Sequence, residues 1–282
     1  MNENLLSEKQ KMLEEIKKND WAFMRASKEL LADKEFMIEA AKKNGGALEL
    51  ASDELKKDKE LVISAVREQG RILRYAAEEL KDDEDVILAA ISSDGSALEF
   101  ATERLRSNKK IALLAVQTTG YGLEFASDEL KNDKEVVLTA VKRDNWALKF
   151  ASDELKNDKQ FISEIIKYNN WCLKYVSEEL KDDKEFVLQA MRGKYDISLL
   201  LASERLQKDT DVVLENISNS LLRTMQYKLK CDIENQEQKR EFIKQNIESI
   251  LLKKCDDKDI LKAVEDTEKY ENLEEILETI KK

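Results

Sequence analysis

The apolar residues of this chain recur in two short patterns with helical spacing. In one stretch, Leu148, Ala151 and Leu155 fall at positions i, i+3 and i+7, and further on Phe161 and Ile165 fall at i and i+4. The alternation by two that a half-buried strand requires is not visible in this stretch. Each pattern covers about ten residues, so we expect two helices of roughly 15 Å joined by a short polar turn.

The pair of patterns returns at a fixed period and is marked by variants of the motif Ala-Ser-acid-Glu-Leu. The closing leucine falls at Leu30, Leu55, Leu80, Leu105, Leu130, Leu155 and Leu180, and an eighth copy ends one position late at Leu206. Self-similarity at a fixed period is the signature of a repeat architecture in which each unit packs on its neighbours. The sequence therefore predicts an all-α solenoid of eight 25-residue helical hairpins with helical caps at both ends. The hand of its superhelix is left undetermined.

Two polar turns separate the predicted helices. Within a unit, the sequence Lys-Asn-Asp-Lys offers a side chain that can cap the second helix. Asn132 with Glu135, and Asp182 with Glu185, have the spacing of a capping box. Between units, one position holds glycine or asparagine in six consecutive copies, namely Gly45, Gly70, Gly95, Gly120, Asn145 and Asn170. Because these residue types best tolerate the left-handed conformation, we expect a left-handed turn at the end of each second helix.

The two ends of the chain depart from the repeat. Residues 13–20, LEEIKKND, resemble the second helix of a unit, and terminal repeats of an array are usually atypical. We therefore expect 1–20 to be an N-terminal capping helix and 21–216 to be the solenoid. Longer helical patterns follow, so 217–282 is expected to form a C-terminal helical cap or bundle.

Whole units have the same order of motifs. The unit GLEFASDELKNDKEVVLTAVKRDN, residues 122–145, joins an aromatic residue and the Ala-Ser-acid-Glu-Leu motif to Lys-x-Asp-Lys-Glu and an apolar run. This pattern resembles the bacterial repeats of domain of unknown function 4116 over about residues 21–216. The resemblance implies a bacterial origin and a repeat module that often accompanies larger effector-like or phage-related proteins. It brings no assigned activity and no catalytic residue, and 217–282 lies outside it.

Composition limits the chemistry that this chain can perform. Among 282 residues there is no proline, which suits an almost wholly helical chain, and no histidine, the commonest general base and transition-metal ligand. Cys172, Cys231 and Cys255 lack metal-ligand spacing, and no loop has the Asp-x-Asp-x-Asp-Gly order of a calcium site. We therefore expect no catalytic residue, no cofactor and no metal, and a protein that is not an enzyme.

Charge and hydropathy set expectations about partners. The net charge of −11 disfavours direct binding of nucleic acid, which needs clustered lysine and arginine, and favours attraction to a basic partner. The first residues lack the features of a signal peptide, and no apolar run approaches the roughly 18–20 residues that a membrane span needs. We expect a cytoplasmic protein without membrane contact. The oligomeric state stays open.

One position of the repeat varies in a way that no packing rule explains. The opening position holds Trp21, Arg71, Tyr121, Trp146 and Trp171, and also glycine, serine and isoleucine. We expect this position to lie on an exposed rim where a partner binds, because exposed aromatic side chains are favoured interface anchors. The alternative is that each ring packs on a neighbouring turn. By contrast, we expect inter-repeat core at the aromatic position before the repeated alanine, which holds Tyr75, Phe100, Phe125, Phe150 and Tyr175.

Acidic residues also recur at fixed positions, among them Asp128, Asp153 and Glu178. A lysine follows at i+3 from each of them, so local ion pairing is one interpretation, and such a pair contributes little to stability. The other interpretation is an acidic rail that docks a cationic surface. Local pairing is the simpler of the two.

These features favour a non-enzymatic helical repeat scaffold that binds a protein partner. One form of it is an acidic inhibitor or immunity-type protein, phage- or defence-related, that occludes a basic nucleic-acid-processing enzyme. The alternatives are a structural or effector-associated module that binds a peptide or a host protein, and an enzyme with its site in the C-terminal segment. In the enzyme, Cys231 or Cys255 would be the nucleophile, without a histidine to activate it.

Overall fold

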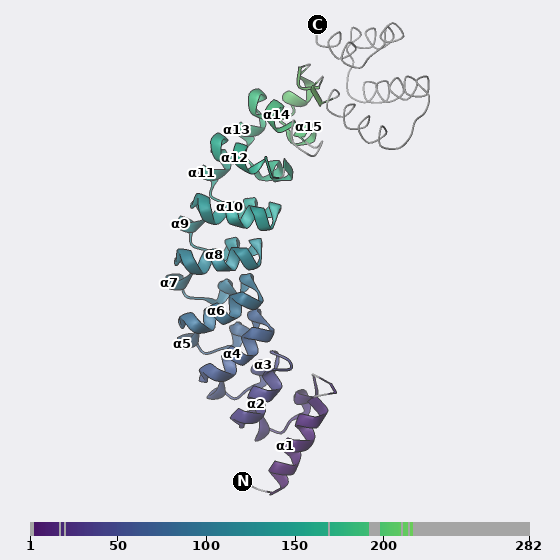
Figure 1. Ribbon diagram of the computed structural model, residues 1–282, viewed down its shortest axis with the longest axis vertical. Coiled ribbons are helices and arrows are strands. Elements are labelled where there is room, and N and C mark those ends of the chain that lie inside the picture. Colours follow the sequence, from purple (N-terminus) through teal and green to yellow (C-terminus); the bar gives the residue numbers. More distant parts are fainter. Residues whose placement is uncertain are drawn as a thin grey trace, which may run out of the picture. The chain divides into compact units, whose positions relative to one another are not determined.

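The computed structural model describes residues 3–16, 18–19, 21–168, 170–191, 198–209, 211–213 and 215–216. In these residues every regular element is a helix, so the expected all-α fold is confirmed (Figure 1). The chain divides into two compact units, residues 1–155 and 156–282. The predicted C-terminal cap at 217–282 lies outside the described residues.

Each of the first seven repeats contains three short helices rather than the expected two. In the repeat that starts at Gly70, a 3₁₀ helix, η4 (Gly70–Tyr75), is followed by a one-turn helix, α5 (Glu78–Lys81), and then by a ten-residue helix, α6 (Glu84–Ser93). The chain breaks at Ala76, which is extended with φ −68° and ψ 153°. The prediction of one continuous first helix was wrong, because the spacing i, i+3 and i+7 fits a 3₁₀ turn followed by a new helix equally well.

The third helix of each repeat is the longest, and it matches the predicted second helix. These long helices are α2 (Lys34–Ala41), α4 (Lys59–Glu68), α6, α8 (Lys109–Thr118), α10 (Lys134–Arg143), α12 (Lys159–Ile165) and α14 (Lys184–Met191). The one-turn helices are α3 (Ala47–Leu50), α5, α7 (Glu103–Arg106), α9 (Asp128–Lys131), α11 (Asp153–Asn157), α13 (Glu178–Lys181) and α15 (Ser198–Leu201). The 3₁₀ helices are η1 (Ala22–Arg25), η2 (Leu30–Ala32), η3 (Leu55–Lys57), η4, η5 (Gly95–Phe100), η6 (Gly120–Phe125), η7 (Asn145–Phe150), η8 (Asn170–Tyr175) and η9 (Leu206–Lys208).

The start of each long helix is fixed by a side-chain cap. The Asp83 carboxylate accepts hydrogen bonds from the amides of Asp85 (3.0 Å) and Val86 (3.2 Å). The equivalent caps are Asp33, Asp58, Asn108, Asp133, Asp158 and Asp183. The expected capping by the Asn-Asp turn is confirmed, but the proposed capping boxes are one position out of register. Asn132 ends α9, and its neighbour Asp133 caps α10.

The serine of the repeated motif has a similar role in the one-turn helices. The Ser127 hydroxyl accepts from the Leu130 amide at 3.4 Å, and the Ser177 hydroxyl accepts from the Leu180 amide at 3.2 Å. A short polar side chain at this position satisfies an amide that a new helix leaves free. The motif is therefore the signature of a helix start after an extended alanine.

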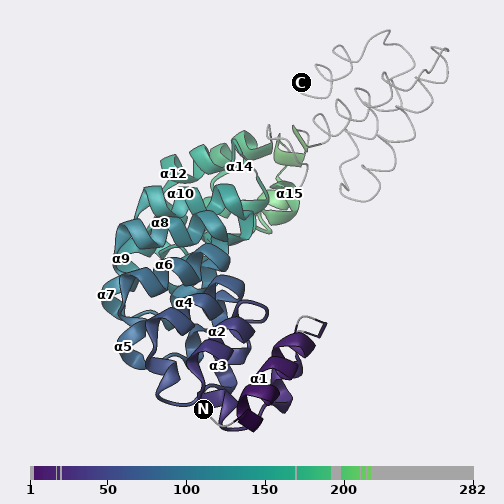
Figure 2. The ribbon, with the colours of Figure 1, turned by 60° about the horizontal axis from the view of Figure 1, so that its bottom comes forward.

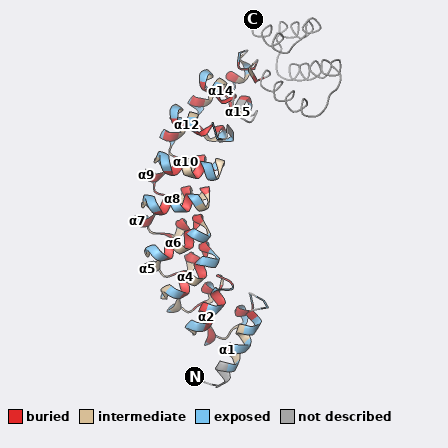
Figure 3. Ribbon diagram, viewed as in Figure 1, coloured by how far each residue is buried: buried red, intermediate tan, exposed pale blue. Residues whose placement is uncertain are grey.

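In the first unit the repeats stack on one another. The long helices α4, α6, α8 and α10 follow in chain order, and the one-turn helices α5, α7 and α9 form a column beside them (Figure 1, Figure 2). Buried and exposed residues alternate around each long helix (Figure 3). The buried face of α6 consists of Val86, Ile87, Ala90 and Ile91. Helices this short are marginal alone, so the shared core between repeats provides their stability.

The glycines between repeats have a different role from the one expected. Among the described residues no glycine and no other residue has a positive φ, so the predicted left-handed turn was wrong. A Cβ at Gly95 would instead clash with the carbonyl oxygen of Ala115 in α8, and one at Gly120 would lie 2.8 Å from the carbonyl oxygen of Ala140 in α10. Glycine occupies this position because the next repeat approaches the backbone closely.

Backbone hydrogen bonds also join consecutive repeats on the side of the one-turn helices. The Thr102 amide donates to the Lys81 carbonyl at 3.3 Å, and the Ser127 amide donates to the Arg106 carbonyl at 3.2 Å. Each bond connects the end of one one-turn helix with the residue before the next. In the second unit, the same bond joins Ser177 to Lys156 at 3.1 Å.

The N-terminal helix α1 (Glu3–Ile16) continues the register of the repeat. Lys9 holds the same repeat position as Lys34, the first residue of α2, and Ile16 is buried at 1 % exposure. The expectation that a half-repeat caps this end fits both observations. Within the described part of the chain, no helix is long and apolar enough to cross a membrane.

Candidate functional site

The opening position of the repeat lies at the surface for most of its members. The side chains of Trp21, Trp146 and Trp171 are 57 %, 36 % and 52 % exposed. Arg71 is also exposed, Tyr121 is half-buried and Ser96 is buried. The last member, Ile197, lies outside the described residues. The predicted exposure of the three tryptophans is confirmed, whereas a role in binding stays a prediction.

Aromatic side chains of two consecutive repeats meet in the first unit. The ring centroid of Tyr121 lies 5.4 Å from that of Trp146 and 5.4 Å from that of Phe150. Trp146 and Phe150 are 5.9 Å apart with their planes at 73°. We call Tyr121, Trp146 and Phe150 the three-ring cluster. Edge-to-face and tilted pairs at these separations are favourable beyond the burial of area.

The aromatic position before the repeated alanine was expected in the core, and that expectation was wrong. Phe100, Phe125 and Phe150 are half-buried, as are Tyr75 and Tyr175. Each lies at the end of a 3₁₀ helix, and in two repeats its ring contacts the opening residue of the same helix, with centroids 5.5 Å apart for Tyr121 and Phe125 and 5.9 Å apart for Trp146 and Phe150. The two aromatic positions therefore form one surface.

Cationic side chains lie over these rings. The Lys149 ammonium is 4.4 Å from the centroid of Phe150, 5.3 Å from that of Trp146 and 6.0 Å from that of Tyr121. In other repeats, the Arg71 guanidinium lies 5.5 Å from the Phe100 centroid, and the Lys174 ammonium lies 5.8 Å from its neighbouring tyrosine ring. Cations at these distances are attracted by the ring quadrupole.

Arg71 is held by the next repeat. Its guanidinium donates to the Ser96 hydroxyl at 3.0 Å and to the Glu99 carboxylate at 2.5 Å. The buried Ser96 hydroxyl donates in turn to Asp94 at 2.7 Å. These hydrogen bonds to two side chains of η5 therefore fix the Arg71 side chain at the surface.

Tyr121 is fixed by a carboxylate on its own 3₁₀ helix. Its hydrogen bond with Glu124 is the main reason that its pKa lies above the ordinary value of 10.0, and burial acts in the same direction. One oxygen of Glu124, Oε2, is buried without a hydrogen-bond partner. Buried polar atoms are normally paired, so this oxygen is an unused acceptor beside the cluster.

The acidic residues of the predicted site lie on the one-turn helices and pair locally. Asp128 begins α9 and lies 3.7 Å from Lys131, and Glu178 begins α13 and lies 2.7 Å from Lys181. Asp153 begins α11. The structure brings Tyr121 and Trp146 together but places Asp128 and Asp153 on other elements. The interpretation of these acids as local partners of lysine is confirmed for Asp128 and Glu178.

A second charged array was not predicted. The first lysine of a long helix bridges two acids of the next repeat, as Lys59 does with Asp83 (2.8 Å) and Asp85 (2.7 Å). The same bridge is formed by Lys9, Lys34, Lys109, Lys159 and Lys184. We call these bridges the lysine ladder. Its usual signal in the sequence is a lysine followed by acids at i+24 and i+26.

The lysine ladder shifts the titration of its members. Partial burial alone would raise the pKa of Asp83, but hydrogen bonds from the Lys59 ammonium and the Val86 amide outweigh it and hold this pKa below the ordinary 3.8. Its two carboxylate partners raise the pKa of Lys59 above 10.5. The same carboxylate therefore caps a helix and joins two repeats.

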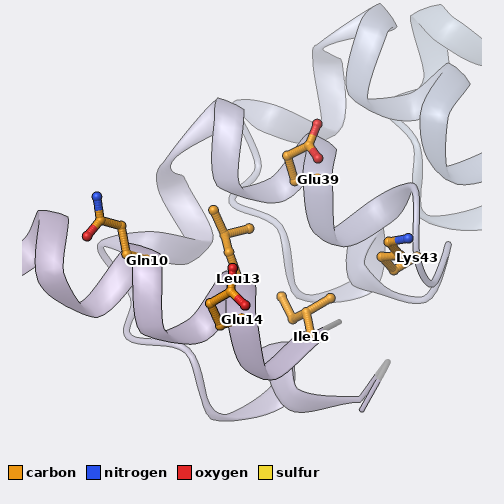
Figure 4. A pocket seen from close by; sticks show the side chains of 6 residues that line it. All are labelled: Gln10, Leu13, Glu14, Ile16, Glu39 and Lys43. Carbon is orange, nitrogen blue, oxygen red and sulfur yellow. The ribbon is translucent and has the colours of Figure 1, made fainter. Parts of the chain in front are cut away.

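A cavity of about 530 Å³ lies between α1 and α2 (Figure 4). It is lined by Gln10, Leu13, Glu14, Ile16, Glu39 and Lys43. The lining has no serine, threonine or cysteine that could act as a nucleophile. Among the described residues, no group of three or more acids and cysteines is arranged to hold a metal ion. The exposed aromatic surface is therefore the better candidate site.

Comparison with known proteins identifies the repeat. The family model described as Domain of unknown function (DUF4116) matches residues 9–56, 33–81, 58–106, 83–131, 108–156, 133–181 and 158–200. Neither the curated proteins nor the solved structures include a significant match. Most matched segments begin at the residue that caps a long helix, and each spans about two repeats.

The matched range differs from the predicted one at both ends. It starts inside α1 at residue 9, earlier than the expected residue 21, and it stops at residue 200 rather than 216. The early start agrees with the register of α1, since Lys9 is the first member of the lysine ladder. Together the segments cover residues 9–200, which is more than half of the chain. The chain therefore belongs to the family described as Domain of unknown function (DUF4116).

Proposed function

We propose that this chain is a non-enzymatic repeat scaffold that binds a basic protein partner. The observation that carries the proposal is the exposure of Trp21, Trp146 and Trp171 at one position of the repeat. Large exposed aromatic side chains cost solubility, and they are the residues that most often anchor protein interfaces. A purely structural repeat would place a small or polar residue there.

The charge of the chain supports a basic partner. The net charge is −11, and Asp128 and Glu178 project into solvent at nearly full exposure. Complementary charge accelerates encounter and selects partners, whereas desolvated aromatic anchors provide affinity. The negative charge and the exposed aromatic side chains together favour one form of this function. It is an acidic inhibitor or immunity-type protein that occludes a basic nucleic-acid-processing enzyme.

The exposed aromatic surface is suited to contact with a partner and not to catalysis. Nucleophilic or acid–base catalysis needs a nucleophile with a neighbouring base, or a pair of acid–base groups with separated pKa values. The three-ring cluster and its surrounding cations offer neither. They offer contact area, which serves recognition.

Affinity capture from a lysate of the native cell, at low and at high salt, tests the proposal. We expect the tagged protein to retain one stoichiometric protein with a high isoelectric point at low salt and to lose most of it at high salt. Capture of an acidic protein, or of no stoichiometric protein at either salt concentration, would contradict the proposal. Far-UV circular dichroism of the eluted protein establishes that it is folded.

A further inference from the structure

The three-ring cluster has the composition of a site for a cation. Tyr121, Trp146 and Phe150 lie with their centroids 5.4 to 5.9 Å apart. A point within about 6 Å of all three centroids attracts a cation, because the quadrupole of each ring contributes there. Aromatic groups arranged in this way bind ammonium and guanidinium groups.

That point is occupied by the protein's own side chain. The Lys149 ammonium lies 4.4, 5.3 and 6.0 Å from the three centroids. Lys149 is exposed, and within the described part of the chain it forms ring contacts and no ion pair. Among the described residues, the ammonium thus has only rings as partners, without a carboxylate to direct it there. It shows which chemical group the cluster attracts.

The surroundings favour a cation from outside the molecule over a further apolar group. Glu124, which is hydrogen-bonded to Tyr121, has the unpaired buried oxygen Oε2. Glu99 lies on the preceding 3₁₀ helix and pairs with Arg71. A planar guanidinium stacks on aromatic faces and donates up to five hydrogen bonds, so it satisfies rings and a carboxylate together.

We propose that the three-ring cluster binds an arginine side chain of a basic protein partner, which displaces Lys149 from the rings. This inference rests on the proposed function and names the chemistry of that function's surface. Lys149 then occupies the site in the free protein and competes with the partner's arginine side chain, so removal of the Lys149 ammonium strengthens the binding of arginine. If Lys149 instead stabilised the three-ring cluster, its removal would weaken the binding of arginine.

Tryptophan fluorescence gives a direct test. The chain has three tryptophans, so replacing Trp21→Phe and Trp171→Phe leaves Trp146 as the only tryptophan emitter. The probe is acetyl-Gly-Arg-Gly-Arg-Gly-amide, and its matched control carries citrulline in place of arginine, which keeps the shape but removes the charge. We expect a saturable change with the arginine peptide and none with the citrulline peptide.

Two charge variants separate competition by Lys149 at the rings from the effect of the protein's net charge on peptide binding. Lys149→Gln should bind the arginine peptide about fivefold tighter, the worth of one cation–ring contact of about 1 kcal/mol. Lys110→Gln removes the same charge from an exposed position on α8 and should leave the affinity within twofold. Equal affinities for the two variants, or for the arginine and citrulline peptides, would overturn the inference.

The result separates this inference from the proposed function. If a basic protein is captured but Lys149→Gln does not tighten binding of the arginine peptide, the arginine site is wrong and the scaffold function stands. If Lys149→Gln behaves as expected but no protein is captured, the arginine site stands and the proposed function is wrong. Circular dichroism of each variant checks that the fold is retained.

Discussion

Gly95 lies directly against the carbonyl oxygen of Ala115 in the following repeat, with no room for a Cβ between them. The same approach recurs at Gly45, Gly70 and Gly120, each facing an alanine carbonyl near the end of the next long helix. In the repeats that carry this glycine, the distance to the next repeat is therefore set by backbone contact. This contact explains why glycine recurs at one position of these repeats without a left-handed conformation.

Gly95→Ala is expected to destabilise the protein by about 1–3 kcal/mol, because the added methyl must push two packed repeats apart. Gly95→Val should cost more, since its branches meet the same backbone. The control is Gly46→Ala, whose new Cβ would have side-chain atoms of Asn44 and Gln69 as its three nearest neighbours, with the Asn44 oxygen at 2.8 Å, and a side-chain atom can move where a backbone carbonyl cannot. Urea unfolding of the variants measures the difference, and equal midpoints for Gly95→Ala and Gly46→Ala would contradict the close approach.

Lys9→Met is expected to lower the free energy of unfolding by about 1–3 kcal/mol, because it leaves a charge-assisted hydrogen bond unmade at a largely buried site. The Lys9 side chain is 10 % exposed and lies 2.8 Å from Asp33 and 3.0 Å from Glu35. Lys11→Met, at an exposed position of the same helix, is the control. If the two variants unfold at the same urea concentration, Lys9 does not join α1 to the array.

The lysine ladder is interrupted at Glu84, and the interruption can be repaired. Glu84 replaces the lysine, and Asn108 and Lys110 replace the two acids that it would bridge. The triple variant Glu84→Lys, Asn108→Asp and Lys110→Glu should gain about 0.2–1 kcal/mol, as expected for an exposed ion pair. Glu84→Lys alone provides no partner and should gain nothing. A triple variant that melts below the wild type would show that the interruption has another purpose.

The lysine ladder also predicts the response to acid. The pKa values of Asp33, Asp58, Asp83 and Asp133 lie below 3.8, so their contribution is fully present above that pH and is lost as pH falls through the lower folded-state values. We expect the free energy of unfolding to fall steeply below pH 3.8. Lys59→Met should lose less between pH 7 and pH 3 than the wild type, because its Asp83 no longer has the lysine that depresses its pKa. Identical losses would contradict the ladder.

The repeat, its period and its long helices follow from the sequence because each depends on local pattern. Apolar residues at i, i+1, i+4 and i+5 define α12, and the Asn-Asp turn supplies a cap for each long helix. The pattern alone places the capping residue one position early, because Asn132 and Asp133 have equivalent side-chain acceptors. Only the backbone geometry decides between them.

The parts that escaped prediction depend on contacts between repeats. Nothing in the local pattern separates a glycine required by a left-handed turn from Gly95, which is required by a neighbouring carbonyl. The aromatic residue Phe150 looks like core because it precedes a repeated alanine, yet it is half-buried and packs against the rings of Tyr121 and Trp146. The lysine ladder is not apparent when residues one repeat period apart are compared. Its acids lie one position to either side of that period, at i+24 and i+26 from the lysine.

The proposed function requires the claim that the exposed tryptophans serve recognition rather than folding. The double variant Trp146→Ala with Trp171→Ala separates these two roles. The measurement is capture of the partner from native lysate by wild-type and variant protein, with the far-UV circular dichroism spectrum and melting temperature of each. We predict that the variant retains its helicity and melts within a few degrees of the wild type but captures no partner, because surface changes usually cost less than about 0.5 kcal/mol. Loss of helicity, or unchanged capture by a folded variant, would contradict the claim.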